Sequence, residues 1–293
     1  MHSHLNTLSF IPLYAAKLAD IPVRICHSHS TAHVSEGIHA FYKYALRPLA
    51  PLFATHLFSC SDYAGKWLYG KKREFYVMRN GIDIERFRFS EYSRKRIREQ
   101  YEISEEEFVV GHVGRFMFQK NHEFLVRIFD LLPIEKKRLL LVGDGQLLDD
   151  VKKQVAELGL SDRIIFVGSV EDTAPCYSAM DVFCLPSRFE GLAVVRVEAL
   201  SAGCPTLVSA RCPCLVSTGQ IPELGNFDEG FINIDDGDEQ LWVEAVMKKK
   251  ELGRIECTKQ LRDCGFDIQH EAEMINRLYL DILNIKAEVS ITR

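Results

Sequence analysis

From residue 107 onward, short apolar runs alternate with amphipathic segments. The apolar runs are rich in β-branched residues and lack polar alternation, which is typical of strands covered on both faces of a parallel sheet. In the segments between them, apolar residues recur near i, i+3, i+4 and i+7, which predicts helices. We expect strands at residues 108–114, 139–145, 164–168, 182–185, 206–208 and 231–234, and helices at residues 121–132, 147–158, 176–180, 192–202 and 239–250.

This alternation predicts a doubly wound α/β sheet, because right-handed crossovers between parallel strands place helices on both faces. Ligands of such sheets bind beyond the carboxyl ends of the strands. The residues expected at these ends are Gly114 and Arg115, residues 143–145, Gly168, and Pro186 and Ser187.

Before residue 85 the same alternation is present but begins abruptly. Helices are expected at residues 5–19, 40–53 and 63–69, the second of them bent near its two prolines, and strands at residues 23–26, 57–59 and 75–78. These elements correspond to the second half of a Rossmann-like domain, and the first half has no counterpart. We therefore expect an incomplete N-terminal domain in which the strands at 23–26 and 57–59 have open edges.

The change in pattern divides the chain into four parts. Residues 86–106 are charged and poor in large apolar groups, which favours an interdomain linker with one exposed helix. The expected organisation is a partial N-terminal domain at 1–85, the linker at 86–106, a C-terminal domain at 107–267, and a C-terminal helix and tail at 268–293.

Composition and charge exclude several classes of protein. With 47% hydrophobic and 26% charged residues, the 293-residue chain suits a folded protein, and no apolar run is long enough for a spanning helix. Residues 1–100 carry fifteen Lys and Arg against eight Asp and Glu, although the whole chain has a net charge of -5. The basic part either faces anionic lipid or a phosphorylated acceptor, or forms a solvated helix face at residues 94–98. No nucleic-acid partner is expected.

The nine cysteines are scattered, with one C-x-C at Cys212 and Cys214 and no CxxC pair. Such scattering favours reduced thiols in a cytoplasmic protein. A redox or metal role for the C-x-C pair stays open as the alternative.

The strongest candidate site follows the strand at 182–185. Glu190 and Gly191 occupy a turn before a helix, and Glu198 lies about two helical turns further on. The N–H groups at the helix start suit a phosphate, and the two carboxylates suit sugar or ribose hydroxyls. The alternative is that Glu198 is solvated and that Glu190 is stabilised by the helix dipole.

A second candidate is the loop after the strand at 108–114. Arg115 and Lys120 lie five residues apart between a strand and a helix, so both cations can converge on one phosphate. Two solvated cations are the alternative. No GxxxxGK[ST] sequence occurs, which argues against a P-loop ATPase.

The order of the motifs resembles a known family. The chain contains Gly-Arg, Gln-Lys-Asn, Val-Gly-Asp-Gly, Phe-Val-Gly, Met-Asp-Val and Pro-Ser-x-x-Glu-Gly, followed by E-x7-E formed by Glu190 and Glu198. This series resembles the retaining GT-B glycosyltransferases of family four, in particular capsular and exopolysaccharide enzymes. The resemblance implies a GT-B fold of two Rossmann-like domains, and here the N-terminal one would be incomplete.

The resemblance also implies how a donor is held at its diphosphate. Arg115 and Lys120 would bind and neutralise the diphosphate, which is also the leaving group. Backbone N–H groups of Gly191, Leu192 and Ala193 would help to hold the phosphate.

For the donor sugar, the resemblance implies three side chains. Glu190 would contact the sugar near the reacting carbon, and Glu198 would bind the ribose hydroxyls. His27 matches the family histidine that touches the sugar; a core or surface histidine is the alternative.

Three departures from the family pattern matter. The family has Pro in place of Ala193 and an apolar residue in place of Arg196. Its glycine-rich acceptor loop has no counterpart here, and Met1 to His4 matches a stretch from the middle of the domain. The resemblance therefore implies an N-terminally truncated enzyme.

The implied reaction is transfer of a sugar, with retention, from a nucleotide-sugar to a polysaccharide or lipid-linked glycan. The donor would be a UDP-sugar, and the enzyme would lie in the cytoplasm or at the inner face of the membrane. No metal or other cofactor is expected, because Arg115 and Lys120 supply positive charge and the D-x-D at Asp236 and Asp238 favours a turn. A catalytically impaired nucleotide-sugar-binding fragment and a sugar-nucleotide epimerase of the same fold are the alternatives.

Overall fold

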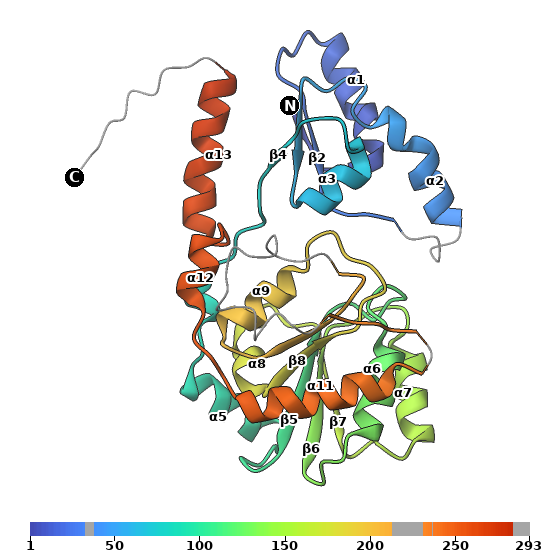
Figure 1. The fold of residues 1–293 in the computed structure, drawn as a ribbon, viewed down its shortest axis with the longest axis vertical. Helices are drawn as coiled ribbons and strands as arrows, with labels where there is room; N and C mark the ends of the chain where they lie inside the picture. The colour runs from blue at the N-terminus through green and yellow to red at the C-terminus, as the bar shows by residue number, and fades with distance from the viewer. Residues whose placement is uncertain (33–37, 213–230, 236, 284–293) are drawn as a thin grey trace, which may run out of the picture. The chain divides into compact units, whose positions relative to one another are not determined.

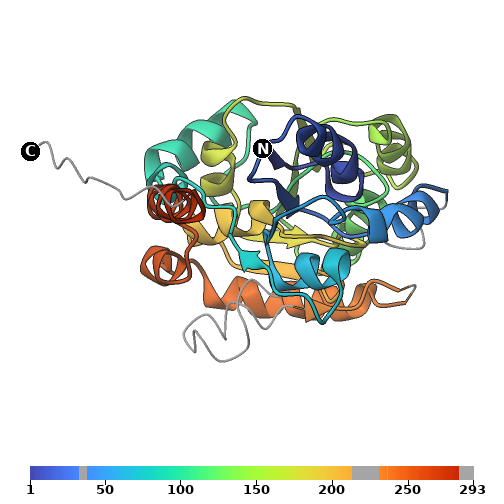
Figure 2. The same ribbon diagram turned by 90° about the horizontal axis from the view of Figure 1, so that it is seen from above.

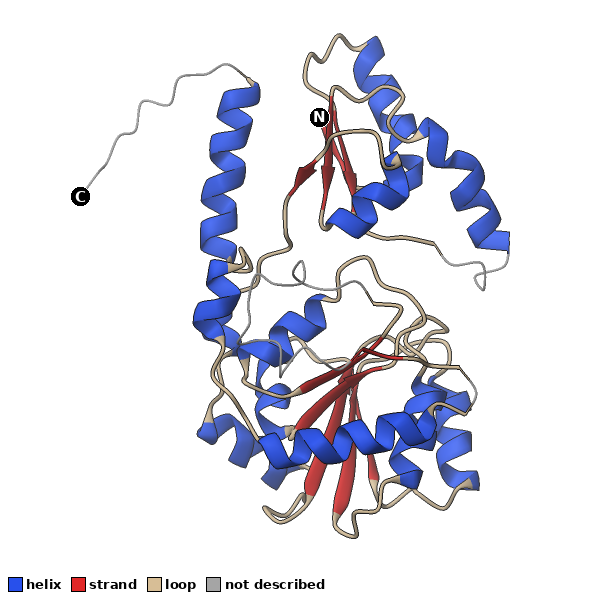
Figure 3. Ribbon diagram, viewed as in Figure 1, coloured by secondary structure: helices blue, strands red, loops and turns tan. Residues whose placement is uncertain are grey.

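A computed structural model of the chain describes residues 1–32, 38–212, 231–235 and 237–283. The chain divides into two compact units: unit 1 comprises Met1–Gly81 and Gly265–Arg293, and unit 2 comprises Ile82–Cys264. In both units helices flank parallel strands, as the colouring of Figure 3 shows. The α/β class expected from the sequence is therefore confirmed.

Unit 2 is built on a six-stranded parallel sheet (Figure 1). The order of its strands is β10-β9-β8-β5-β6-β7, so the direction of winding reverses between β5 and β8. The strands are β5 (Phe108–Val113), β6 (Lys137–Val142), β7 (Ile164–Gly168), β8 (Val182–Leu185), β9 (Thr206–Ser209) and β10 (Phe231–Ile232).

Both faces of this sheet are covered. Along β6, Leu139 and Leu141 belong to one apolar cluster, and Leu140 and Val142 belong to the other. Figure 2 shows the sheet between helix α11, in orange, and helix α5, in green. Each fully buried aliphatic side chain contributes about 1.5–3 kcal/mol. The helices of unit 2 are α4 (Ile84–Phe87), α5 (Glu91–Gln100), α6 (His122–Leu131), α7 (Leu148–Glu157), α8 (Ala174–Ala179), α9 (Val194–Ser201), α11 (Glu239–Leu252) and α12 (Thr258–Asp263).

Residues 86–106 differ from the linker expected from the sequence. They contain the second half of α4 and all of α5, which lie within unit 2, and α5 packs on α8. Arg98 is 1% exposed and donates to Asp181 Oδ2 at 2.8 Å, and Arg94 donates to Asp181 Oδ1 at 2.9 Å. The helix therefore has a buried face that apolar counting missed, because arginine rather than leucine occupies it. Arg94 and Arg98 are not part of a solvated basic surface.

Unit 1 has a four-stranded parallel sheet in the order β1-β2-β3-β4. Strands β2 and β3 each pair on both sides, so the open edges expected on them are absent from the described sheet. The edge strand β1 was not expected, because two residues carry no periodic pattern. The elements of unit 1 are β1 (His2–Ser3), a 3₁₀ turn (Asn6–Ser9), α1 (Phe10–Leu18), β2 (Ile25–Ser28), α2 (Ile38–Leu46), a 3₁₀ turn (Arg47–Leu49), β3 (His56–Ser59), α3 (Asp62–Tyr69), β4 (Tyr76–Val77) and α13 (Ile268–Ile282).

The closing helix α13 belongs to unit 1 and does not form a separate tail segment. His2 Nδ1 lies 2.6 Å from Tyr279 Oη, and the Arg79 guanidinium lies 5.8 Å from the centre of the Phe266 ring. A Cβ on Gly81 would lie 2.8 Å from Ile268 Cα, so backbone meets backbone at the start of α13. The C-terminal domain was expected to end at residue 267, whereas unit 1 resumes at Gly265. Among the described residues, no helix combines the length and apolarity needed to cross a membrane.

Candidate active site

The candidate site of unit 2 lies where the winding of the sheet reverses. The loop after β5 and the loop after β8 leave the sheet from neighbouring strands. Doubly wound sheets leave a crevice for ligands at this point, because the two connections turn to opposite faces. Lys120 lies in the first loop and Glu190 in the second.

The two loops are joined through Glu190, which is 6% exposed. Lys120 Nζ donates to Glu190 Oε1 at 2.7 Å, and Gln119 Nε2 donates to Glu190 Oε2 at 3.1 Å. The backbone reinforces the link, since Arg188 N donates to the carbonyl of Gln119 at 2.8 Å. The structure thus brings together two of the residues expected at the site and holds a carboxylate and an ammonium at the carboxyl edge of the sheet.

Arg115 is exposed in the same β5 loop and lines a cavity of about 560 Å³. This cavity lies over the carboxyl ends of β5 and β6 and the start of the loop after β7. Residues that line it include Gly114, Arg115, Gly143, Asp144, Ser169 and Thr173.

Close packing of two backbone loops sets the position of Arg115. Gly143 has φ +136°, and a Cβ there would collide with the carbonyl of Gly114. Phe116 N donates to the carbonyl of Asp144 at 2.9 Å. A side chain at residue 143 would force the loops apart, so the Gly-x-Gly sequence has a packing function here.

Helix α9 begins at Val194, two residues later than expected, because Val194 N donates to the carbonyl of Leu192 in a preceding turn. Ala193 is the N-cap and offers no side-chain oxygen, and no described side chain caps the helix. Helix ends without a side-chain cap leave N–H groups for water or a ligand. Gly191 and Ala193 are buried, whereas Leu192 is partly exposed.

Glu198, on α9, accepts a hydrogen bond of 2.6 Å from Tyr177 Oη. Burial raises the pKa of this carboxyl, while the Tyr177 hydroxyl and the charges of Arg86 and Lys120 act in the opposite direction. Tyr177 is buried in α8 and was missed by sequence reasoning, because an aromatic residue in a short apolar helix looks like core.

His27 lies in unit 1, at the carboxyl end of β2, and is 1% exposed. Its neighbours are three further histidines, His2, His4 and His29, whose rings stack or tilt against one another. Burial, then the charges of these rings, lowers the pKa of His27 to about 2. Sequence reasoning selected His27 alone. The available signal was the repeated His-Ser-His in two segments, which parallel pairing brings together.

The remaining candidates are less informative. Burial raises the pKa of the Cys212 thiol to about 12, so it stays protonated, and Cys214 lies outside the described residues. Asp236 also lies outside the described residues. Asp238 accepts a hydrogen bond of 2.8 Å from Asp235 N, which is the geometry of a turn.

The chain is similar to known glycosyltransferases. Residues 93–221, which include both loops, match the family described as Glycosyl transferases group 1. EpsF of Bacillus subtilis, which carries the name of a glycosyltransferase, is 29% identical over 302 residues, covering 98% of this chain and 75% of its own length. The chain is a glycosyltransferase of the GT-B fold.

One further relative and one solved structure are also similar to this glycosyltransferase. The UDP-Gal:alpha-D-GlcNAc-diphosphoundecaprenol alpha-1,3-galactosyltransferase of Escherichia coli is 28% identical, covering 97% of this chain and 75% of its own. The crystal structure of Anabaena HepE in complex with UDP and glucose has a TM-score of 0.75 at 22% identity, covering 92% of this chain and 75% of that one. The GT-B fold expected from the motifs is confirmed.

Proposed function

We propose that this glycosyltransferase moves a sugar from a UDP-sugar, with retention, to a polysaccharide or lipid-linked glycan. The observation that carries the proposal is the Lys120–Glu190 contact at the reversal point of the sheet, beside the cavity lined by Arg115. A site of this kind presents cations to a phosphate and a carboxylate to sugar hydroxyls from loops that the sheet holds in place.

In the transfer, the bond between the anomeric carbon and the terminal diphosphate oxygen breaks, and an acceptor hydroxyl oxygen takes that oxygen's place. The acceptor proton is released, and UDP departs with the bonding electrons. Arg115 and Lys120 stabilise the negative charge that develops on the departing diphosphate. This electrostatic role needs no metal.

The other residues bind and orient the donor. The N–H groups of Gly191, Leu192 and Ala193 contact the phosphate at the start of α9. Glu190 contacts the sugar near the reacting carbon, and Glu198 binds the ribose hydroxyls, with Tyr177 orienting its carboxylate. His27 contributes a neutral imidazole to the sugar.

The relatives support the donor and the acceptor class. The name of the Escherichia coli enzyme specifies a UDP-sugar donor and a diphosphoundecaprenol-linked acceptor, and HepE was crystallised with UDP. A lipid-linked acceptor would bring the enzyme to the inner face of the membrane.

Calorimetry with UDP and transfer assays with UDP-sugars test the site. We expect Lys120→Ala to weaken UDP binding about ten- to hundredfold, because one charge-assisted hydrogen bond contributes about 1.5–3 kcal/mol. Glu190→Gln should lower turnover about a hundredfold or more, the typical loss when an electrostatic contact made in the transition state is removed.

The chain offers a matched control pair. Lys153 and Glu157 also form a Lys–Glu contact, at 3.9 Å, but both side chains are mostly exposed on α7. Lys153→Ala and Glu157→Gln should leave UDP binding and transfer unchanged. Unchanged UDP affinity and transfer in the Lys120 and Glu190 variants, with thermal unfolding confirming that they fold, would overturn the proposed site.

Product analysis distinguishes the alternative functions. A new nucleotide-sugar formed without acceptor would indicate an epimerase. UDP-sugar binding without any product, across acceptors that include undecaprenol-linked sugars, would indicate a binding protein.

A further inference from the structure

The sequence His-Ser-His occurs at the start of the chain and again at residues 27–29. Strands β1 and β2 pair in parallel, with His2 opposite Ile25 and Ser3 opposite Cys26. Because side chains alternate between the faces of a strand, continuation of this register places all four histidines on one face. Ser3 and Ser28 point the other way and bond within unit 1, to Ser9 and to the carbonyl of Ala64.

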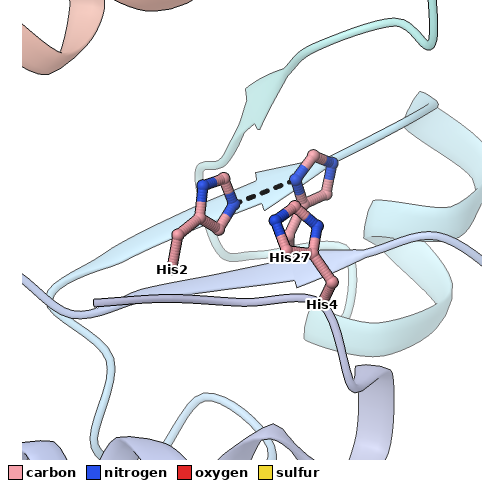
Figure 4. A group of neighbouring side chains, drawn as sticks. All are labelled: His2, His4 and His27. Atoms are coloured by element: carbon pink, nitrogen blue, oxygen red, sulfur yellow. Dashed lines mark hydrogen bonds between the residues drawn. The ribbon is translucent and has the colours of Figure 1, made fainter.

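The four rings form one cluster. Figure 4 shows three of them, those of His2, His4 and His27. His2 Nε2 lies 3.0 Å from His27 Nδ1, and His4 Nδ1 lies 2.6 Å from His29 Nε2. His2, His4 and His27 each offer one nitrogen within 4.8 Å of the others. Tetrahedral Zn²⁺ binds imidazole nitrogens at about 2.0–2.1 Å, which separates two such nitrogens by about 3.3 Å.

The cluster leaves one buried nitrogen unsatisfied. None of the described residues forms a hydrogen bond with His27 Nε2. If His2 Nδ1 donates to Tyr279 Oη, His27 Nδ1 must donate to His2 Nε2, and His27 Nε2 is a bare lone pair. If the Tyr279 hydroxyl donates instead, the proton chain runs the other way and His27 Nε2–H lacks an acceptor. A buried polar group without a partner costs about 1–3 kcal/mol.

Neutral imidazole is the form in which a histidine nitrogen donates to a metal. An all-nitrogen donor set suits Zn²⁺, Ni²⁺ or Cu²⁺ and disfavours Mg²⁺ and Ca²⁺, which prefer oxygen.

We propose that His2, His4 and His27 form a binding site for a divalent transition-metal cation, with Zn²⁺ as the reference ion and His29 as a fourth ligand. The first tautomer above supplies an outer contact of the kind such sites use, because His2 donates its Nδ1–H to Tyr279 and keeps a lone pair on Nε2. The site goes beyond the proposed transfer, in which no metal takes part. Since sugar and metal would both use His27, bound metal should compete with the donor sugar.

The test is calorimetric titration of ZnCl₂ into the full chain, prepared without an affinity tag and freed of metal. We expect one Zn²⁺ per chain. His4→Ala, at an exposed position, and His2→Phe, which keeps a ring against Phe58, should each weaken binding at least tenfold. His270→Ala, at an exposed position on α13, is the matched control and should leave binding unchanged.

Two measurements keep the outcome unambiguous. Thermal unfolding of the metal-free variants shows whether they fold, and His4→Ala is expected to match the parent chain. The absorption spectrum of the Co²⁺ form identifies the ligands: nitrogen ligation gives d–d bands without thiolate charge transfer. Absence of saturable Zn²⁺ binding, equal binding by the two histidine variants, or a thiolate band would each overturn the proposal.

Discussion

Unit 2 has a six-stranded sheet with apolar clusters on both faces, whereas unit 1 has a four-stranded sheet whose edge strands β1 and β4 are two residues long. The described core of unit 1 includes a small cluster around Leu13, Leu68 and Tyr69. Many large apolar side chains of its helices are exposed, among them Ile11, Tyr14, Leu18, Phe41 and Tyr42.

The units also differ in how their buried polar groups are paired. In unit 2, Arg98 meets Asp181 and Lys120 meets Glu190, so opposite charges are matched. In unit 1 the polar cluster around His27 consists of like groups, and none of the described residues forms a hydrogen bond with His27 Nε2. The proposed donor site of unit 2 therefore contains paired opposite charges, whereas the proposed cation site of unit 1 contains imidazoles alone.

The largest expected effect tests how strongly unit 2 depends on its matched charges. Arg98→Met should lower the free energy of unfolding of unit 2 by about 3–5 kcal/mol. Asp181 keeps Arg94 but loses its buried partner, and three backbone carbonyls lose the Arg98 donor. The measurement is denaturant unfolding followed by Trp242 fluorescence in a Trp67→Phe background, since each unit contains one of the two tryptophans.

Arg96 lies on the same helix but is exposed, so Arg96→Met should change stability by less than about 0.5 kcal/mol. If Arg98→Met lowered the free energy of unfolding by no more than Arg96→Met, the buried ion pair would not distinguish unit 2 from unit 1.

A second, smaller effect is the pH dependence of unit 2. Burial lowers the pKa of His112 to about 3 and that of His122 to about 2. Each therefore contributes stability that is complete above the unfolded pKa of about 6.5 and is lost as the pH falls toward the folded value. Between pH 6.5 and 5.5, unit 2 should lose about 1 kcal/mol for each histidine.

The matched variant is His122→Phe. Its ring can stack on Phe116 as the imidazole does, with the two ring centres 3.9 Å apart. In this variant the two-histidine loss of stability between pH 6.5 and 5.5 should be about half as large, because only His112 remains. Glu198, with a raised pKa, acts in the opposite direction because its stabilising effect is lost as the pH rises. The comparison of parent and variant cancels that effect. Identical pH profiles would show that the pKa of His122 is the same in the folded and unfolded states.

The smallest expected effect is that of chelation on transfer. Because Arg115 and Lys120 of unit 2 supply the positive charge, EDTA should leave the rate of transfer from a UDP-sugar unchanged within about twofold. Restoration of a lost rate by Mg²⁺ or Mn²⁺ would contradict this assignment. Added Zn²⁺ should slow transfer in the parent chain and less so in His4→Ala, because the metal and the donor sugar would both use His27.

Much of unit 2 could be predicted from the sequence. Its strands are continuous apolar runs, and such runs are stable only when both faces of the sheet are covered. The sequence therefore predicted a doubly wound sheet. The residues around Glu190 and Lys120 were found because they follow strands, and the ends of parallel strands meet at one edge. The local pattern of apolar residues was therefore sufficient to predict these strands and the residues that follow them.

Other features depended on partners that are distant in the sequence. Helix α5 was expected in a linker because its buried face carries Arg98, whose partner Asp181 lies 83 residues away. Tyr177 gained its place beside Glu198 by the packing of α8 and α9.

The sequence by itself determined the alternation of strands and helices and placed the candidate cations and carboxylates at strand ends, because both follow from local hydrophobic periodicity. The tertiary structure decided which of those residues meet: the strand order brought Lys120 to Glu190, and the pairing of β1 with β2 brought two His-Ser-His segments into one cluster. Contacts of this kind depend on register and strand order, which residues close in sequence do not specify.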